Sequence, residues 1–69
     1  MSDSIYKVVE VVGSSEESWE EAAKKAIERA GQTLRNLRVA EVVDQDIKIE
    51  DGKAVNFRTK VRLSFKFED

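Results

Sequence analysis

Residues 37–68 read LRVAEVVDQDIKIEDGKAVNFRTKVRLSFKFE, with an Asp51-Gly52 turn signal between two β-branched segments. The second segment, Ala54 to Glu68, alternates between apolar and charged side chains. This alternation indicates a strand with one face on a core and the other in water. We therefore expect a long β-hairpin whose first strand runs from Leu37 to about Ile49. The core face of the second strand would carry Phe57, Thr59, Val61, Leu63, Phe65 and Phe67.

The register of the hairpin follows from which alternate residues of each strand face the core. A two-residue turn at Asp51-Gly52 would set the charged Asp46 opposite the apolar Phe57, which a shared face does not allow. Adding one residue to the loop removes the conflict, so we predict a three-residue turn with a bulge at Gly52. The core positions expected in the first strand are Val43, Ile47 and Ile49. The predicted pairs are Glu50–Ala54, Ile47–Phe57, Asp46–Arg58 and Asp44–Lys60.

The N-terminal half predicts a strand followed by a helix. Ile5 to Val12 is β-branched and mostly apolar, which is typical of a strand. Ser14 and Glu17 have the spacing of a capping box, so the helix is expected from about Ser15 to Arg35. Trp19 lies on its apolar stripe and is interpreted as a core or subunit-contact residue. The other positions of the stripe are Ala22, Ala23, Ala26, Ile27, Ala30 and Leu34.

These elements predict an α+β fold of order β-α-β-β, a three-stranded antiparallel sheet with one helix packed across it. The 69 residues allow a single domain, 1–69. A helix of about 20 residues spans about 30 Å and covers one face of the sheet. The other face of the sheet and its long edges are left uncovered, and exposed sheet edges are usually blunted or paired. The pattern therefore favours an oligomer.

The composition excludes several kinds of site. The chain has no Cys and no His, so it has no disulfide, no thiolate or imidazole ligand and no histidine base. We expect no enzymatic activity, since no nucleophile motif or phosphate loop is present either. The net charge of −2 argues against nucleic-acid binding. No apolar stretch is long enough to span a membrane, and no signal-peptide pattern is recognised, so a cytoplasmic protein is expected.

The sequence resembles the dodecin family over nearly its whole length. The resemblance lies in YKVVEVVGSS at residues 6–15, in ERAGQTLRNL at residues 28–37 and in VRLSFKFE at residues 61–68. It implies a β-α-β-β subunit that assembles with eleven copies of itself into a hollow shell. Many dodecins bind flavins in stacked pairs at subunit contacts, for storage or photoprotection. The partner expected by resemblance is therefore the chain itself, as a homododecamer.

Two positions depart from the flavin-binding members of that family. By the resemblance, Val39 stands where those proteins carry a Trp that stacks on the flavin ring. Arg58 stands where they carry a Gln that hydrogen-bonds the ring edge. A valine has no flat π-face, and a guanidinium has no acceptor. We therefore do not expect flavin as a cofactor, although a flavin-binding dodecin with a degenerate pocket is the alternative.

The stretches SWEEAA, RVAEVVDQD and FRTKVRLSFKF resemble a subset known as calcium-binding, non-flavin dodecins. That resemblance implies a Ca²⁺ site. Because Ca²⁺ prefers oxygen ligands, the acids considered are Asp44 and Asp46 on one face of the strand and Glu16 and Glu17 at the helix start, together with ligands from other subunits. The metal ligands predicted from these are Glu17 and Asp44. Both match acidic positions that line the ligand pocket in flavin dodecins. The simpler interpretation remains open for each residue: Glu17 caps the helix, and Asp44 pairs with Lys60.

Overall fold

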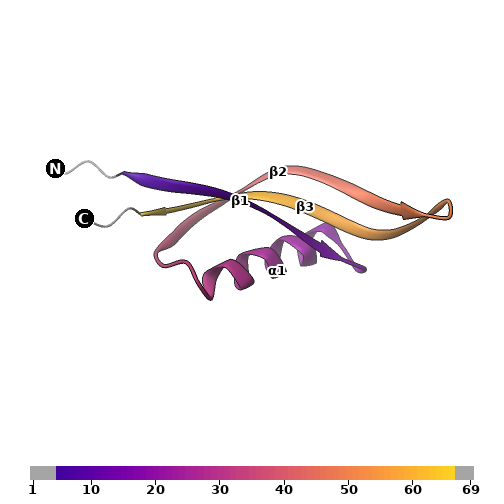
Figure 1. The fold of residues 1–69 in the computed structure, drawn as a ribbon, viewed down its shortest axis with the longest axis horizontal. Helices are drawn as coiled ribbons and strands as arrows, with labels where there is room; N and C mark the ends of the chain where they lie inside the picture. The colour runs from indigo at the N-terminus through magenta and orange to yellow at the C-terminus, as the bar shows by residue number, and fades with distance from the viewer. Residues whose placement is uncertain (1–4, 67–69) are drawn as a thin grey trace.

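A computed structural model describes residues 5–66 of the chain. The element order is β-α-β-β, as the sequence predicts (Figure 1). The elements are β1 (Tyr6–Ser15), α1 (Trp19–Gly31), β2 (Leu37–Glu50) and β3 (Lys53–Lys66). The predicted positions Phe67 and Glu68 lie outside the described residues.

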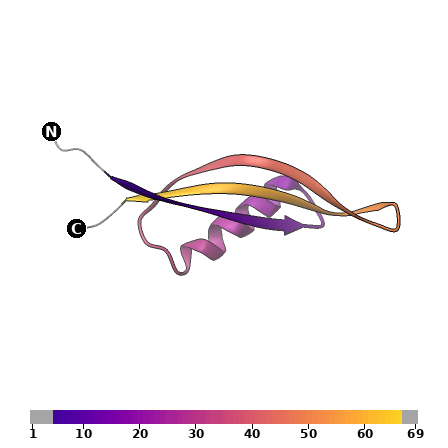
Figure 2. The ribbon, with the colours of Figure 1, turned by 45° about the horizontal axis from the view of Figure 1, so that its top comes forward.

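The three strands form one antiparallel sheet in the order β1-β3-β2. The last strand of the chain is therefore central, and both β1 and β2 are edge strands. Helix α1 crosses one face of the sheet, and the β2–β3 hairpin continues well beyond the start of the helix (Figures 1 and 2). The principal dimensions are 54 × 20 × 14 Å, so much of the sheet has no second layer over it.

The core lies between α1 and the central strand. Thr59, Val61 and Leu63 are fully buried, which confirms the predicted alternation of β3. Ala22 and Ala26 face them from the helix. Burying a Val or Leu side chain stabilises the fold by about 1.5–3 kcal/mol. The residues packed around this centre are Val9, Val11, Ala23, Ile27, Ala30 and Leu37.

The small side chains of α1 let it approach β1 very closely. A Cβ atom added to Gly13 would lie 2.1 Å from the carbonyl oxygen of Ala22 and 3.0 Å from the Cβ of Ala26. Only a residue without a side chain fits there. The alanine stripe and Gly13 together set the distance between the helix and the sheet.

The helix is shorter than predicted, and its predicted cap is wrong. Ser14 is still in β1, where it pairs with Arg58. The N-cap is Ser18, whose Oγ accepts a hydrogen bond of 3.0 Å from the amide of Glu21. Ser18 and Glu21 have the same Ser-x-x-Glu spacing as the predicted pair, four residues later. The stretch SSEESWEE contains this spacing twice, and continuation of the sheet pairing through Ser15 selects the second.

Replacing the cap tests this assignment. Ser18→Ala is expected to lower the free energy of unfolding by about 1 kcal/mol, because the amide of Glu21 loses its partner. Ser14→Ala is the matched control and should change it by less than about 0.5 kcal/mol, since Ser14 is exposed. Urea denaturation at one protein concentration measures both. A larger loss at Ser14 would contradict the assignment.

The hairpin turn also differs from the prediction. Asp51 and Gly52 form a two-residue turn, with Glu50 opposite Lys53 and φ values of 52° and 73°. Positive φ at both central residues is the geometry of a type I′ turn. The extra residue is Val55, because Lys48 pairs with Asn56 and Ile49 with Ala54. The predicted pair Glu50–Ala54 and the bulge at Gly52 are therefore wrong. The pairs Ile47–Phe57, Asp46–Arg58 and Asp44–Lys60 are confirmed.

Strand β2 contains a further irregularity that the parity argument did not predict. Val42 pairs with Val61 and Asp44 with Lys60, so Val43 is an extra residue between them. The expected core positions of this strand are not buried within the chain: Val43, Ile47 and Ile49 are 39%, 38% and 66% exposed. The reason is that α1 lies mainly over β1 and β3 and leaves β2 open.

Candidate functional site

The face of the sheet opposite α1 carries most of the charged side chains of the strands, and we call it the outer face. Its central row is on β3, because the alternate residues Thr59, Val61 and Leu63 point toward the helix. The register places side chains of β1 and β2 on either side of that row. The residues of the outer face used below are Glu10, Val12, Val39, Glu41, Asp44, Asp46, Arg58, Lys60 and Arg62.

A hollow of about 120 Å³ lies on the outer face. Its lining residues come from all three strands: Val12, Asp44, Asp46, Arg58 and Lys60. Arg58 and Asp46 lie opposite each other in register and form a bidentate pair, in which Nε and Nη2 donate to Oδ1 and Oδ2 at 2.7 Å each. The guanidinium is therefore already occupied by a carboxylate of the same chain.

The hydrogen bonds from Arg58 are the main reason that the pKa of Asp46 lies below its usual 3.8, with further lowering by the charges of Arg58 and Lys60. In turn, Asp46 raises the pKa of Arg58. A lowered carboxyl pKa stabilises the fold at neutral pH, and this contribution is lost as the pH falls from about 4 through the folded-state value.

This pKa can be measured directly. Arg58→Gln is expected to return the pKa of Asp46 toward 3.8, since the bidentate donor is removed. A ¹³C NMR titration of the Asp46 carboxyl carbon follows the change. Arg62→Gln is the matched control and should leave that titration where it is. An unchanged Asp46 titration in the Arg58 variant would show that the pair does not form in solution.

Asp44 and Lys60 lie opposite each other, but they do not form one of the ion pairs found among residues 5–66. Oδ1 of Asp44 accepts a 3.0 Å hydrogen bond from the amide of Gln45. Asp44 is exposed, so its carboxylate retains acceptor capacity for a further ligand.

Arg62 joins the three strands on the outer face. It bonds Glu10 of β1 at 2.9 Å and Glu41 of β2 at 3.4 Å, and these acids raise its pKa. Of the basic residues that alternate along β3, Arg58 and Arg62 are thus paired with acids of neighbouring strands. Acids of the neighbouring strands therefore offset the charge of these two arginines on the outer face.

The four residues selected from the sequence do not meet at one place within the chain. Asp44 and Arg58 line the same hollow. Val39 is 58% exposed and pairs with Ser64. The register of β2 shifts between Leu37 and Val39, and there Val39 also borders a different depression, together with Ile27 and Leu37. Glu17 is exposed in the segment before α1, where its amide bonds the Oγ of Ser15 at 2.9 Å.

The capping interpretation of Glu17 is wrong, since the cap is Ser18 and the residue three positions later is Glu21. Within residues 5–66, no three acidic side chains gather as a metal site. Since Ca²⁺ takes six to eight oxygens, a site that uses Glu17 and Asp44 requires ligands from beyond one copy.

Trp19 makes a polar contact that the sequence did not indicate. Its Nε1 donates a 3.0 Å hydrogen bond to the carbonyl oxygen of Asp46. Its ring meets Phe57 edge to face, with centroids 5.1 Å apart. The residue is only partly buried, so it lies at the margin of the core, against the base of the hairpin. The apolar stripe predicted that Trp19 packs inward, but its polar partner depends on how β2 passes the helix.

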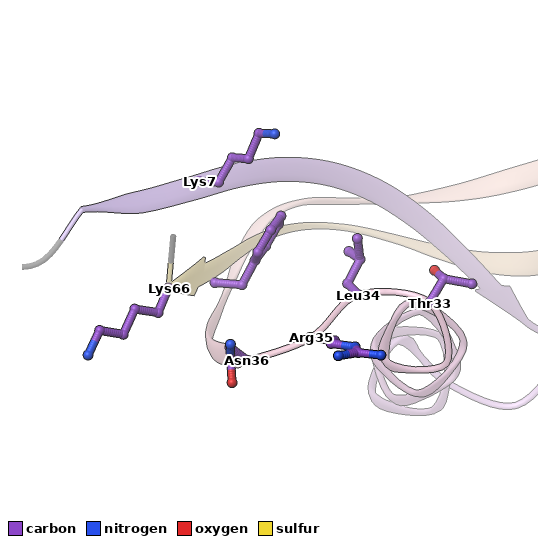
Figure 3. Close-up of a pocket in the computed structure, with 7 residues that line it drawn as sticks. Lys7, Thr33, Leu34, Arg35, Asn36 and Lys66 are labelled. Atoms are coloured by element: carbon purple, nitrogen blue, oxygen red, sulfur yellow. The ribbon is translucent and has the colours of Figure 1, made fainter. Parts of the chain in front are cut away.

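A second hollow, of about 300 Å³, lies between the chain after α1 and the end of β3 (Figure 3). It is lined by Lys7, Thr33, Leu34, Arg35, Asn36, Phe65 and Lys66. Figure 3 shows that the charged ends of Lys7, Arg35 and Lys66 point in different directions. They do not converge on one point, as the binding of a single anion would require.

Comparison with known proteins gives the family. The sequence profile of the family described as Dodecin matches residues 5–68. The chain belongs to the dodecin family. The calcium dodecin of Mycobacterium tuberculosis is 40% identical over 91% of this chain and 89% of its own. The dodecin of Thermus thermophilus is 35% identical over 94% of each chain.

The solved structures agree with this family membership. Dodecin from Streptomyces coelicolor superposes with a TM-score of 0.91, at 39% identity, over 100% of this chain and 99% of its own. The M. tuberculosis calcium dodecin, described as calcium chelating and with a novel calcium-binding site, has a TM-score of 0.83 over 93% and 91% of the two chains. The helix described in the present chain is too short to cross a bilayer.

Proposed function

We propose that this dodecin is a cytoplasmic binding and storage protein, not an enzyme, that assembles as a hollow homododecamer. Its proposed ligand is Ca²⁺, bound at contacts between copies, and flavin is not its cofactor. The proposal combines the membership of the family with three features of the chain: an open strand, two exposed carboxylates and an altered flavin position.

The single observation that carries the proposal is the exposure of β2. Every residue of this 14-residue edge strand after Leu37 is exposed in the single chain. Five of them are large apolar residues, 38–66% exposed: Val39, Val42, Val43, Ile47 and Ile49. Such an edge is a template for association, and apolar surface of this extent usually marks an interface. We infer that further copies of the chain cover it.

Glu17 and Asp44 are proposed as Ca²⁺ ligands at those contacts. Both are exposed, and neither takes part in an ion pair found within residues 5–66. The chain alone does not bring a third acid to them, so additional oxygens from a neighbouring copy or from water would complete the coordination. The calcium dodecin of M. tuberculosis supports the choice of ion, because it is 40% identical to this chain.

Val39 and Arg58 support the exclusion of flavin. Val39 supplies no surface for ring stacking. Asp46 binds one edge of the Arg58 guanidinium, through Nε and Nη2, and a guanidinium has no acceptor, so Arg58 does not offer the donor and acceptor of a glutamine amide. The alternative function, a riboflavin- or FMN-binding dodecin with a degenerate pocket, would require stacking on another group.

Native mass spectrometry tests the proposal. The protein as purified should have the mass of twelve chains, plus calcium ions that a chelator removes and added CaCl₂ restores. Added riboflavin or FMN should produce no mass increase. Asp44→Asn and Glu17→Gln should lose calcium and keep the twelvefold mass, with Glu28→Gln on the helix as the control that retains it. Flavin uptake would favour the alternative, and a monomer would refute the proposed assembly.

A further inference from the structure

The contacts of Trp19 connect the start of α1 to the outer face of the sheet. Trp19 is the first residue of α1 and directly follows its N-cap, Ser18. Its carbonyl oxygen also accepts a 2.9 Å hydrogen bond from Oγ1 of the buried Thr59. The indole N–H donates to the carbonyl of Asp46 on the edge strand β2.

Asp46 has two partners on different sides of its own backbone. Its main-chain carbonyl accepts a hydrogen bond from the indole N–H, and its carboxylate accepts hydrogen bonds from Nε and Nη2 of Arg58. Phe57, the residue next to Arg58 on β3, also contacts the Trp19 ring. A single side chain of the helix therefore touches both strands of the hairpin beside the hollow.

Within one copy of the chain, before any neighbouring copy covers the strand, β2 has few other supports at Asp46. The strand is at the edge of the sheet, has an extra residue at Val43 and is exposed along its length. Edge segments of this kind open locally at low free-energy cost. The hydrogen bond from Trp19, at the capped start of the helix, restrains the backbone beside the hollow that Asp44 and Asp46 line.

We propose that Trp19 is a positioning residue for the outer-face site. It holds the backbone of Asp46 and so fixes the guanidinium of Arg58 and the neighbouring carboxylate of Asp44. The part of this inference that concerns Ca²⁺ rests on the proposed function, since it takes Asp44 as a ligand. The part that concerns Arg58 stands on the contacts of the single chain.

Two variants separate positioning from simple stability. Trp19→Phe removes the indole N–H and keeps an aromatic ring beside Phe57. Thr59→Val removes a different hydrogen bond of the same residue, the one to its carbonyl, and does not touch Asp46. Each is applied to the full chain in its assembled state, and the urea midpoint of each gives its cost in stability.

The first measurement is hydrogen exchange of the Arg58 Nε–H, followed by NMR. Trp19→Phe should speed this exchange by about fivefold, the equivalent of one net hydrogen bond, while Thr59→Val leaves it within about twofold. The same rate in Trp19→Phe as in the unmodified protein would overturn the inference. Equal acceleration in both variants would also overturn it, because the effect would then follow from stability alone.

The second measurement is Ca²⁺ affinity by titration calorimetry with CaCl₂. Trp19→Phe should weaken binding by about fivefold and Thr59→Val should not. If the unmodified protein binds no Ca²⁺, the proposed function fails, and Arg58 exchange alone still decides whether Trp19 positions the site. If the unmodified protein binds Ca²⁺ and both variants bind it equally well, the positioning of Asp44 is refuted.

Discussion

Replacing Gly13 with alanine is expected to lower the free energy of unfolding by about 3 kcal/mol, at the upper end of the range for overpacking. The added Cβ would lie 2.1 Å from the carbonyl oxygen of Ala22, which is a backbone atom of the helix and cannot rotate away. The helix would have to move off the sheet. Such a shift would also disturb the contacts of Ala26 with Val61 and Leu63, which form the core cluster.

Gly31→Ala provides the matched control. The nearest atom to a Cβ at Gly31 is Cδ1 of Leu37 at 3.8 Å, which is ordinary contact, and the residue is the last of α1. The same substitution should therefore be neutral or stabilise the protein by about 0.5 kcal/mol. Urea denaturation must be compared at one protomer concentration, since assembly contributes to apparent stability. Equal effects at the two glycines would contradict the close packing of α1 on β1.

The fold could be predicted because its signals are redundant. The alternation of β3 identifies the core face over several two-residue repeats, and Thr59, Val61 and Leu63 are buried as this alternation predicts. The spacing of the alanines predicts a helix that lies close to the sheet, and Gly13 shows how close. A misplaced boundary does not change this outcome, because each element is supported by many residues.

The local errors share one physical cause, which is that short motifs occur more than once or can be satisfied in more than one way. SSEESWEE offers two caps, and the pairing of β1 decides between them. The parity conflict at the hairpin requires one extra residue but does not say where it lies. An extra residue in the loop and an extra residue in β3 would both remove the conflict. Because Asp51-Gly52 forms a two-residue type I′ turn, the extra residue is Val55 in β3.

The site was only partly predictable for a related reason. The pair Asp46–Arg58 follows from register alone and was predicted. The contact from Trp19 to the same Asp46 requires β2 to pass the start of the helix at hydrogen-bond distance, and periodicity carries no information on that. The roles proposed for exposed residues such as Val39 and Glu17 depend on contacts with further copies, which the sequence of one chain does not describe.

The other large effect is expected from restoring the two flavin positions together. The double variant Val39→Trp/Arg58→Gln should bind riboflavin about tenfold to a hundredfold more tightly than the unmodified protein, since stacking of a ring on an aromatic side chain contributes about 1–3 kcal/mol. The glutamine adds the donor and acceptor that the guanidinium lacks, and it frees the hollow from the Asp46 pair. Quenching of riboflavin fluorescence measures the affinity.

Val42→Trp/Arg58→Gln is the control, because Val42 pairs with Val61 and so lies on the opposite side of β2 from Val39. It adds the same indole to the same exposed strand, and riboflavin affinity should not rise. If both double variants gained affinity equally, the indole would be acting as a nonspecific apolar surface. If neither gained any, the loss of flavin binding would not lie in Val39 and Arg58. Gain in the Val39 variant alone would mean that these two side chains separate this dodecin from the flavin-binding members of its family.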